Sequence, residues 1–179
     1  ELDEQANRVA NALLEKQGRG RGSVGLLLEH GIPMVVSILG VLKAGKTYVP
    51  LHRRHPESRL SQILNDCQAT SVIVGANDSA VVQSLRHSGP ELYPFEALRS
   101  HHDQSRPDVE ILPTSFASAM YTSGSTGQPK GVWQKHRNIL HSVRNYTNGI
   151  HISSADRLSL LADFSFAASI SAIFGSLLN

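Results

Sequence analysis

Hydrophobic residues recur along this chain in two alternating patterns, one typical of amphipathic helices and the other of short buried strands. From Leu2 to Leu14 the apolar residues repeat at helical spacing, and Gly18 ends that helix. The same reasoning predicts further helices over 32–44, 56–67, 78–86, 136–148 and 165–178, and strands over 23–28, 47–51, 71–74, 115–121, 132–135 and 158–162. Strands that alternate with helices predict an α/β fold with a mainly parallel sheet flanked by helices. The polar stretch from His87 to Pro113 is expected to be an irregular surface excursion.

Composition and charge mainly exclude classes of function. The chain has 179 residues, enough for one domain with a core, and a formal net charge of +2 whose basic residues are scattered, which argues against nucleic acid or a membrane surface as partner. The longest apolar stretch, 32–42, is too short to span a bilayer. The single Cys67 excludes an internal disulfide and fits a cytoplasmic location. The adjacent His101 and His102 are expected on a solvated loop, so no metal site is predicted.

The segment YTSGSTGQPKGV, from Tyr121 to Val132, has the most informative chemistry in the chain. Seven of the ten residues from Thr122 to Gly131 are Gly, Ser or Thr. They offer backbone N–H groups, four hydroxyls and the ammonium of Lys130 at the end of a predicted strand, a combination that suits phosphate. The Walker pattern is excluded because no Ser or Thr follows Lys130, and a flexible Ser/Gly linker is the less favoured alternative.

This segment also resembles the phosphate-loop signature of the adenylate-forming (AMP-binding) enzymes. Three other stretches resemble motifs of the same superfamily in the same order: ELDEQANRVANALLEKQG (Glu1–Gly18), LKAGKTYVPL (Leu42–Leu51) and FSFAASISAIFGSLLN (Phe164–Asn179). They are most similar to the adenylation domains of nonribosomal peptide synthetases. LKAGKTYVPL is expected to be structural, and His52, which follows it where the family usually has Asp, is given no mechanistic role.

The resemblance implies an ATP-dependent reaction that joins a carboxylate to AMP, releases pyrophosphate, and passes the acyl group to the phosphopantetheine of a carrier protein or to coenzyme A. It implies that phosphate binds to Thr122, Ser123, Gly124, Ser125, Thr126, Gly127 and Lys130. Lys130 is the implied catalytic residue, because it would neutralise the leaving pyrophosphate; the alternative is a solvated surface lysine. The Mg²⁺ ligands, ribose-binding Asp and second catalytic Lys of the family would lie beyond Asn179. Residues 1–179 are therefore expected to be a partial N-terminal subdomain that is inactive alone.

The acyl pocket implied by the resemblance includes Phe166, Ala167 and Ser171. Adenylation domains for α-amino acids have Asp where this chain has Ala167, and that Asp pairs with the substrate ammonium. An alanine cannot supply this charge, which favours a substrate without an α-amino group. Two alternatives remain: Ala167 is only a helix-forming core residue, or the protein is a non-catalytic, degenerate adenylation-like module with a binding or scaffolding role.

Overall fold

The structure is a computed structural model that describes residues 1–75, 80–85, 89–123 and 129–178. Its helices are α1 (Leu2–Gln17), α2 (Ile32–Lys43), α3 (Glu57–Asp66), α4 (Ala80–Leu85), α5 (Phe95–Arg99), α6 (His136–Gly149) and α7 (Ala168–Leu177). Its strands are β1 (Ser23–Leu27), β2 (Thr47–Pro50), β3 (Ser71–Val74), β4 (Glu91–Pro94), β5 (Phe116–Ser123) and β6 (Pro129–Lys135). Asp78, the expected cap of α4, lies outside the described residues.

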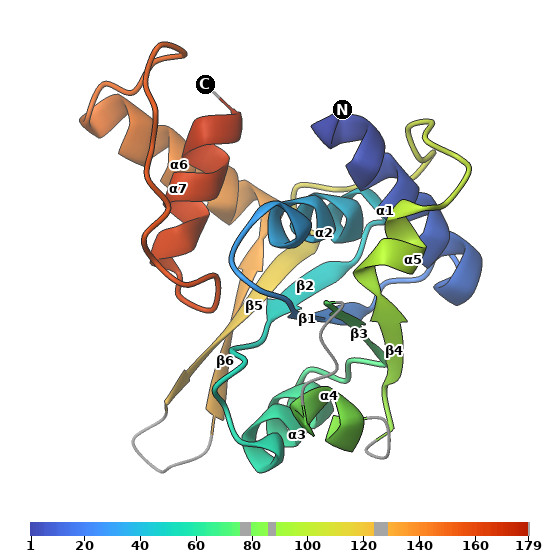
Figure 1. The fold of residues 1–179 in the computed structure, drawn as a ribbon. Coiled ribbons are helices and arrows are strands. Elements are labelled where there is room, and N and C mark those ends of the chain that lie inside the picture. Colours follow the sequence, from blue (N-terminus) through green and yellow to red (C-terminus); the bar gives the residue numbers. More distant parts are fainter. Residues whose placement is uncertain (76–79, 86–88, 124–128, 179) are drawn as a thin grey trace.

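The six strands form one sheet in the order β4-β3-β1-β2-β5-β6 (Figure 1). All neighbouring pairs are parallel except β5 and β6, which form an antiparallel hairpin. The expected α/β class with a mainly parallel sheet is confirmed. The chain leaves β1 toward β2 on one side and later returns to β3 on the other side of β1. This reversal of direction opens a crevice at the carboxyl ends of the strands, where α/β proteins bind ligands.

Helices cover both faces of this sheet. Helices α1, α2 and α5 lie above it in Figure 1 and α3 and α4 below it, each layer with its own buried apolar cluster. The upper cluster continues into α6 and α7 through residues such as Val143 and Phe174. Strands β1, β2 and β3 are buried along their whole length, which explains their continuous apolar sequences.

The stretch LKAGKTYVPL forms the corner between α2 and β2, as its composition indicated. Gly45 has a φ of 71°, a left-handed conformation that favours glycine. Lys46 is 3% exposed, and its ammonium donates hydrogen bonds to the carbonyl oxygens of Gly18 and Gly20, at 3.2 and 2.9 Å. These bonds satisfy the end of α1 and hold it against the corner.

Two sequence predictions about secondary structure were wrong. The stretch 87–113 contains β4 and α5, and its loop is held to α1, for example by Arg8, which donates to the carbonyl of His101. The polar sequence of β4 reflects its place at the edge of the sheet, where only one neighbour is needed and Pro94 is tolerated. Conversely, 158–162 forms no strand: no described strand pairs with it, and Leu161 is 90% exposed.

Helix α7 begins three residues later than the apolar pattern predicts. The carboxylate of Asp163 accepts hydrogen bonds from the backbone N–H and the hydroxyl of Ser165, at 2.9 and 2.6 Å. The N–H of Phe166 bonds to the carbonyl of Asp163, which closes a turn before the helix. This turn fixes the backbone position of Phe166 and Ala167 directly before α7.

Candidate active site

The strand end that precedes the predicted phosphate loop is well defined. In the β5–β6 hairpin, Thr122 pairs with Lys130 and Ser123 with Pro129, and both Thr122 and Lys130 are exposed. Strand β5 also extends past β2, because Tyr48 is level with Ser118 and β2 ends at Pro50. Thr122 therefore lies beyond the carboxyl end of β2. Gly124, Ser125, Thr126 and Gly127 lie outside the described residues.

The Gly that ends the phosphate-loop motif has a packing role. Tyr121 pairs with Gly131, and its ring lies over that residue: a Cβ added to Gly131 would be 2.9 Å from Cζ of Tyr121. The Tyr121 hydroxyl donates a hydrogen bond of 2.5 Å to the carboxylate of Asp66 at the end of α3. The hairpin is thus fastened to α3 directly beside the predicted phosphate loop.

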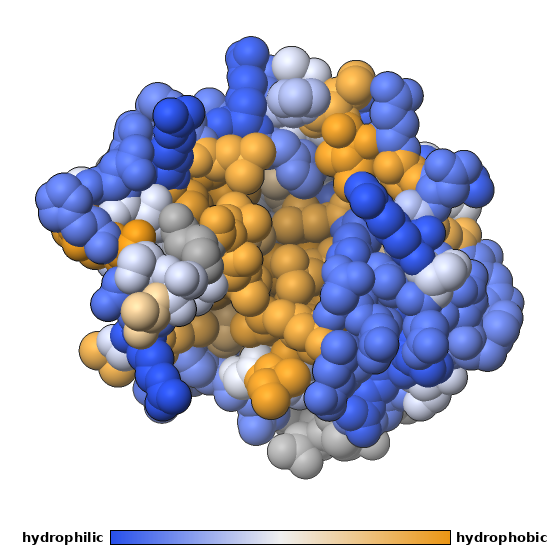
Figure 2. All heavy atoms as spheres, turned by 90° about the horizontal axis from the view of Figure 1, so that it is seen from above, coloured by the Kyte–Doolittle hydropathy of each residue, from blue (hydrophilic) through white to orange (hydrophobic). Residues whose placement is uncertain are grey.

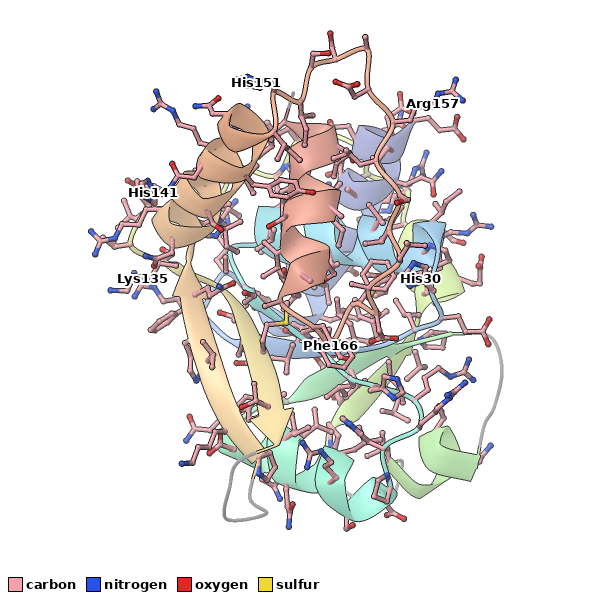
Figure 3. The ribbon with its side chains drawn as sticks, turned by 90° about the vertical axis from the view of Figure 1, so that its left-hand side faces the viewer. His30, Lys135, His141, His151, Arg157 and Phe166 are labelled. Atoms are coloured by element: carbon pink, nitrogen blue, oxygen red, sulfur yellow. The ribbon has the colours of Figure 1, made fainter. Side chains whose placement is uncertain are left out.

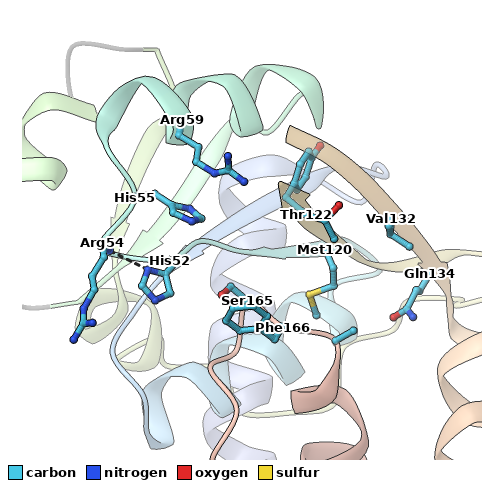
Figure 4. A pocket seen from close by; sticks show the side chains of 12 residues that line it. His52, Arg54, His55, Arg59, Met120, Thr122, Val132, Gln134, Ser165 and Phe166 are labelled. Atoms are coloured by element: carbon cyan, nitrogen blue, oxygen red, sulfur yellow. Dashed lines mark hydrogen bonds between the residues drawn. The ribbon is translucent and has the colours of Figure 1, made fainter. Parts of the chain in front are cut away.

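A pocket of about 680 Å³ opens beside this hairpin (Figure 4). It is lined by His52, Arg54, His55, Arg59, Met120, Tyr121, Thr122, Val132, Gln134, Ser165, Phe166 and Ala167. The lining comes from the segment after β2, from α3, from both strands of the hairpin and from the turn before α7. The pocket therefore joins the strand end of the predicted phosphate loop to the predicted acyl-pocket residues.

Two of the three predicted acyl-pocket residues line this pocket. Phe166, which is 62% exposed, and Ala167 lie directly before α7, and Figure 3 shows Phe166 at the end of this helix that faces the lower half of the molecule. Ser171 is one helical turn further along α7 and is not part of the lining. Among the residues that the structure describes, Ala167 is exposed.

The opposite wall is basic, and the sequence pattern did not indicate it. His52 and His55 lie on the connection from β2 to α3 with ring centroids 5.2 Å apart, and Arg59 follows on α3. In Figure 4 the side chains of His55 and Arg59 point toward the interior, whereas the Arg54 guanidinium points away. The available signal was the basic run 52–55, which the sequence places next to a motif with a structural role.

The electrostatics of this wall are dominated by burial and by like charge. Burial lowers the pKa of His55, Arg59 and His52 lower it further, and Asp163 acts in the opposite direction. Asp163 lies 3.8 Å from Nε2 of His52. Burial raises the pKa of the Asp163 carboxyl, but the hydrogen bonds from Ser165 and the nearby histidines outweigh this effect, and its pKa is lowered overall. His55 is therefore mainly neutral at pH 7 and Asp163 is ionised.

Hydrophobic surface is concentrated at the end of the molecule where both termini lie. Seen from that end, apolar side chains fill a hollow between hydrophilic flanks (Figure 2). Leu177 and Leu178 at the end of α7 are 40% and 55% exposed, although the rest of the helix packs well on α6. Among the described residues, no helix is long and apolar enough to cross a membrane.

Comparison with known proteins agrees with this fold and pocket. The family model of the AMP-binding enzymes matches residues 1–179. Tyrocidine synthase 1 of Brevibacillus parabrevis is 35% identical over 179 residues, which are 100% of this chain and 16% of that protein. The chain belongs to the AMP-binding enzyme family, within which its curated relatives are the adenylation domains of nonribosomal peptide synthetases.

Two solved structures show how widely this fold is shared. A nonribosomal peptide synthetase, FmoA3, in its AMPPNP-bound form has a TM-score of 0.84 and 27% identity, covering 98% of this chain and 18% of that one. The inhibitor-bound N-terminal domain of FACL13 from Mycobacterium tuberculosis has a TM-score of 0.87 and 28% identity, covering 98% of this chain and 46% of that one. The chain thus spans less than half of these proteins.

Proposed function

We propose that this chain is the N-terminal part of a domain that adenylates a carboxylic acid with ATP. The observation that carries the proposal is the shared pocket: Thr122, at the strand end of the phosphate loop, and Ala167, in the acyl-pocket motif, line the same cavity. A carboxylate oxygen of the acid attacks the α-phosphorus of ATP, and the bond to the bridging oxygen breaks to release pyrophosphate. The acyl group then passes to the thiol of carrier-protein phosphopantetheine or of coenzyme A, and AMP leaves.

The hairpin suits the phosphate side of this reaction. Phosphoryl chemistry requires positioning and charge neutralisation more than covalent help. Lys130 is exposed and its backbone is fixed opposite Thr122, so its ammonium is free to reach a phosphate held by the loop that joins them. Mg²⁺ accompanies the nucleotide in this proposal, with ligands outside residues 1–179. The reaction is placed in the cytoplasm, where Cys67 remains a free thiol.

The acid that fits this pocket lacks an α-amino group. Ala167 offers no charge, and the facing wall contains the guanidinium of Arg59, which repels an ammonium. Asp163 is the nearest carboxylate along the chain, but it is not part of the pocket lining, and one of its oxygens accepts two hydrogen bonds from Ser165. A hydroxy, keto, aryl or acyl acid avoids the cost of burying an unpaired ammonium.

A second function is favoured by one observation. The absence of the ammonium-binding Asp at Ala167 also fits a degenerate, non-catalytic module that binds ligand without adenylating it. The two proposals differ only in whether the longer protein adenylates the acid that it binds.

Pyrophosphate exchange into ATP by the longer protein tests the main proposal. Some carboxylic acid should support exchange, and Lys130→Ala should slow it at least about tenfold, because a charge near the leaving group is lost. Lys16→Ala, on α1 far from the pocket, is the matched control and should leave exchange unchanged. No exchange with any acid supports the non-catalytic module, and normal exchange by Lys130→Ala removes Lys130 from the mechanism.

A substrate panel scored by the same exchange tests the pocket. Acids without an α-amino group should be preferred, and Ala167→Asp should shift preference toward α-amino acids. A large preference of the unmodified protein for an α-amino acid contradicts the inference from Ala167.

A further inference from the structure

We propose that His55 and Arg59, with His52 beside them, form a binding site for an anionic oxygen group inside this pocket. The group is a phosphate or a carboxylate carried by a ligand. The inference deepens the proposed function, because it assigns a charge to the part of the ligand that lies against this wall.

This wall has buried nitrogen atoms without hydrogen-bond partners among the described residues. Nδ1 of His55 and Nε of Arg59 are buried, and neither has a hydrogen-bond partner among the residues that the structure describes. Leaving a buried donor unpaired costs stability, and the cost is larger for a charged group. Because protein covers these two atoms, a ligand in the pocket meets the outer nitrogens of the same two side chains, Nε2 of His55 and the terminal amino groups of Arg59.

The described lining of the pocket contains no carboxylate. By contrast, Arg53, which lies outside this pocket, forms an ion pair with Glu29. Asp66 accepts the hydrogen bond of the Tyr121 hydroxyl, and Asp163, which is not part of the lining, accepts hydrogen bonds from Ser165 and lies 3.8 Å from His52. A cation in a half-enclosed cavity without a counter-charge attracts anions more strongly than one on an open surface.

The pocket is divided into a basic wall and an apolar wall. The basic side chains lie on one side, and Met120, Val132 and Phe166 form an apolar surface on the other (Figure 4). A ligand with an apolar body and a charged end is oriented by such a pocket. Arg59 provides planar donors that match a carboxylate or a phosphate in a bidentate geometry.

Anion binding at this wall is coupled to protonation of His55. The titratable and charged groups that act on His55 are Arg59 on α3, His52 on its own connection and Asp163 on the segment before α7, whereas the Arg54 guanidinium points away. Burial and the two basic neighbours lower the pKa of His55, whereas a bound anion raises it. Binding therefore takes up a proton, and the affinity for an anion of fixed charge increases as the pH falls below 7.

The test is isothermal titration calorimetry on the 179-residue chain at low ionic strength. Pyrophosphate represents a nucleotide phosphate, succinate represents an acid substrate with a second carboxylate, and malonamide is the neutral control. At least one of the two anions should bind, and Arg59→Gln should weaken it about tenfold or more, as expected for the loss of a charged hydrogen bond. Arg157→Gln has the same change in charge on the outer surface and should have little effect (Figure 3).

The pH dependence is measured with sulfate, whose charge is constant between pH 5.5 and 8. Its affinity should rise severalfold toward the acidic end, and His55→Gln should flatten that rise while the surface variant His141→Gln should not. Thermal melting verifies that each variant is folded, and Arg59→Lys replaces Arg59→Gln if the latter fails to fold. Arg59→Lys should lose part of the affinity, because it keeps the charge but not the planar donors.

The outcomes separate the two sources and the two proposals. Tighter binding of pyrophosphate assigns the wall to the nucleotide, and tighter binding of succinate assigns it to the acid. The inference is overturned if neither anion binds better than malonamide, or if Arg59→Gln and Arg157→Gln weaken binding equally. Because titration requires no turnover, failure of pyrophosphate exchange in the longer protein leaves this result intact, and the reverse also holds.

Discussion

Replacing Gly131 by alanine should destabilise the protein, although the same change in an open strand or loop would stabilise it. Gly→Ala at a compatible position gains about 0.4–1 kcal/mol, because the unfolded chain loses conformational freedom. At Gly131 the new methyl carbon would lie 2.9 Å from Cζ and 3.0 Å from the hydroxyl oxygen of Tyr121. Carbon atoms in contact are normally about 3.5–4.0 Å apart, so the ring must move by roughly 0.5–1 Å.

That movement has two costs. Overpacking costs about 1–3 kcal/mol, and displacement of the ring lengthens the 2.5 Å hydrogen bond from Tyr121 to Asp66. We assign about 1 kcal/mol to overpacking and, because Asp66 is exposed, only about 0.5 kcal/mol to the lengthened hydrogen bond, and we subtract a gain of about 0.5 kcal/mol for Gly→Ala. The expected net loss in the free energy of unfolding is about 1 kcal/mol.

The assay is urea unfolding followed by the fluorescence of Trp133, the single tryptophan, which packs edge-on against Phe116 at a centroid distance of 5.2 Å. In a Tyr121→Ala background the space is open, so Gly131→Ala should instead stabilise by about 0.5 kcal/mol, a coupling of about 1.5 kcal/mol. Gly22→Ala, where no atom lies within 4 Å of the added carbon, is the control and should stabilise. The reasoning is refuted if Gly131→Ala stabilises the unmodified protein, or if its effect is the same in both backgrounds.

Three further predictions concern other parts of the molecule. Gly40→Ala should lower the free energy of unfolding by about 1–3 kcal/mol, because the added carbon would lie 2.5 Å from a side-chain carbon of Val9. The control Gly149→Ala, whose added carbon has no atom within 4 Å, should not lower it, and urea unfolding measures both variants. Ser37→Ala should raise the melting temperature, because the hydroxyl is fully buried without a partner among the described residues and alanine favours the helix; a lower melting temperature would contradict this. The pKa of His55 is lowered in the folded state, so the unfolded chain binds a proton at this residue first, and the free energy of unfolding falls as the pH drops below about 6.5. His55→Gln should reduce this loss of stability in urea midpoints measured from pH 7.5 to 5. If the loss is unchanged in the variant, His55 is not its source.

The sequence determined most elements of this fold because their signals are local. Periodic apolar residues from Leu2 onward, continuous apolar runs such as 71–74, and the Gly stop after α2 are properties of neighbouring residues. The phosphate-loop motif and the family were also readable in this way, since the motif is one contiguous string. The element bounds then differ from the prediction by only a few residues.

Tertiary structure alone decided where strands find partners. The apolar run 158–162 forms no strand because none of the described strands lies beside it, and the polar β4 is a strand because β3 offers it an edge. Hydrogen bonding between strands is a property of pairs, which a single run of residues does not contain.

The two walls of the pocket were decided in the same way. His55 and Ala167 are separated by more than a hundred residues in the sequence and line one cavity because β5 lies next to β2 and α7 folds back over the hairpin. The sequence indicated the chemistry of Thr122 and Ala167 through contiguous motifs. Only folding placed them opposite His55 and Arg59, because the charge that a side chain faces depends on residues distant in the chain.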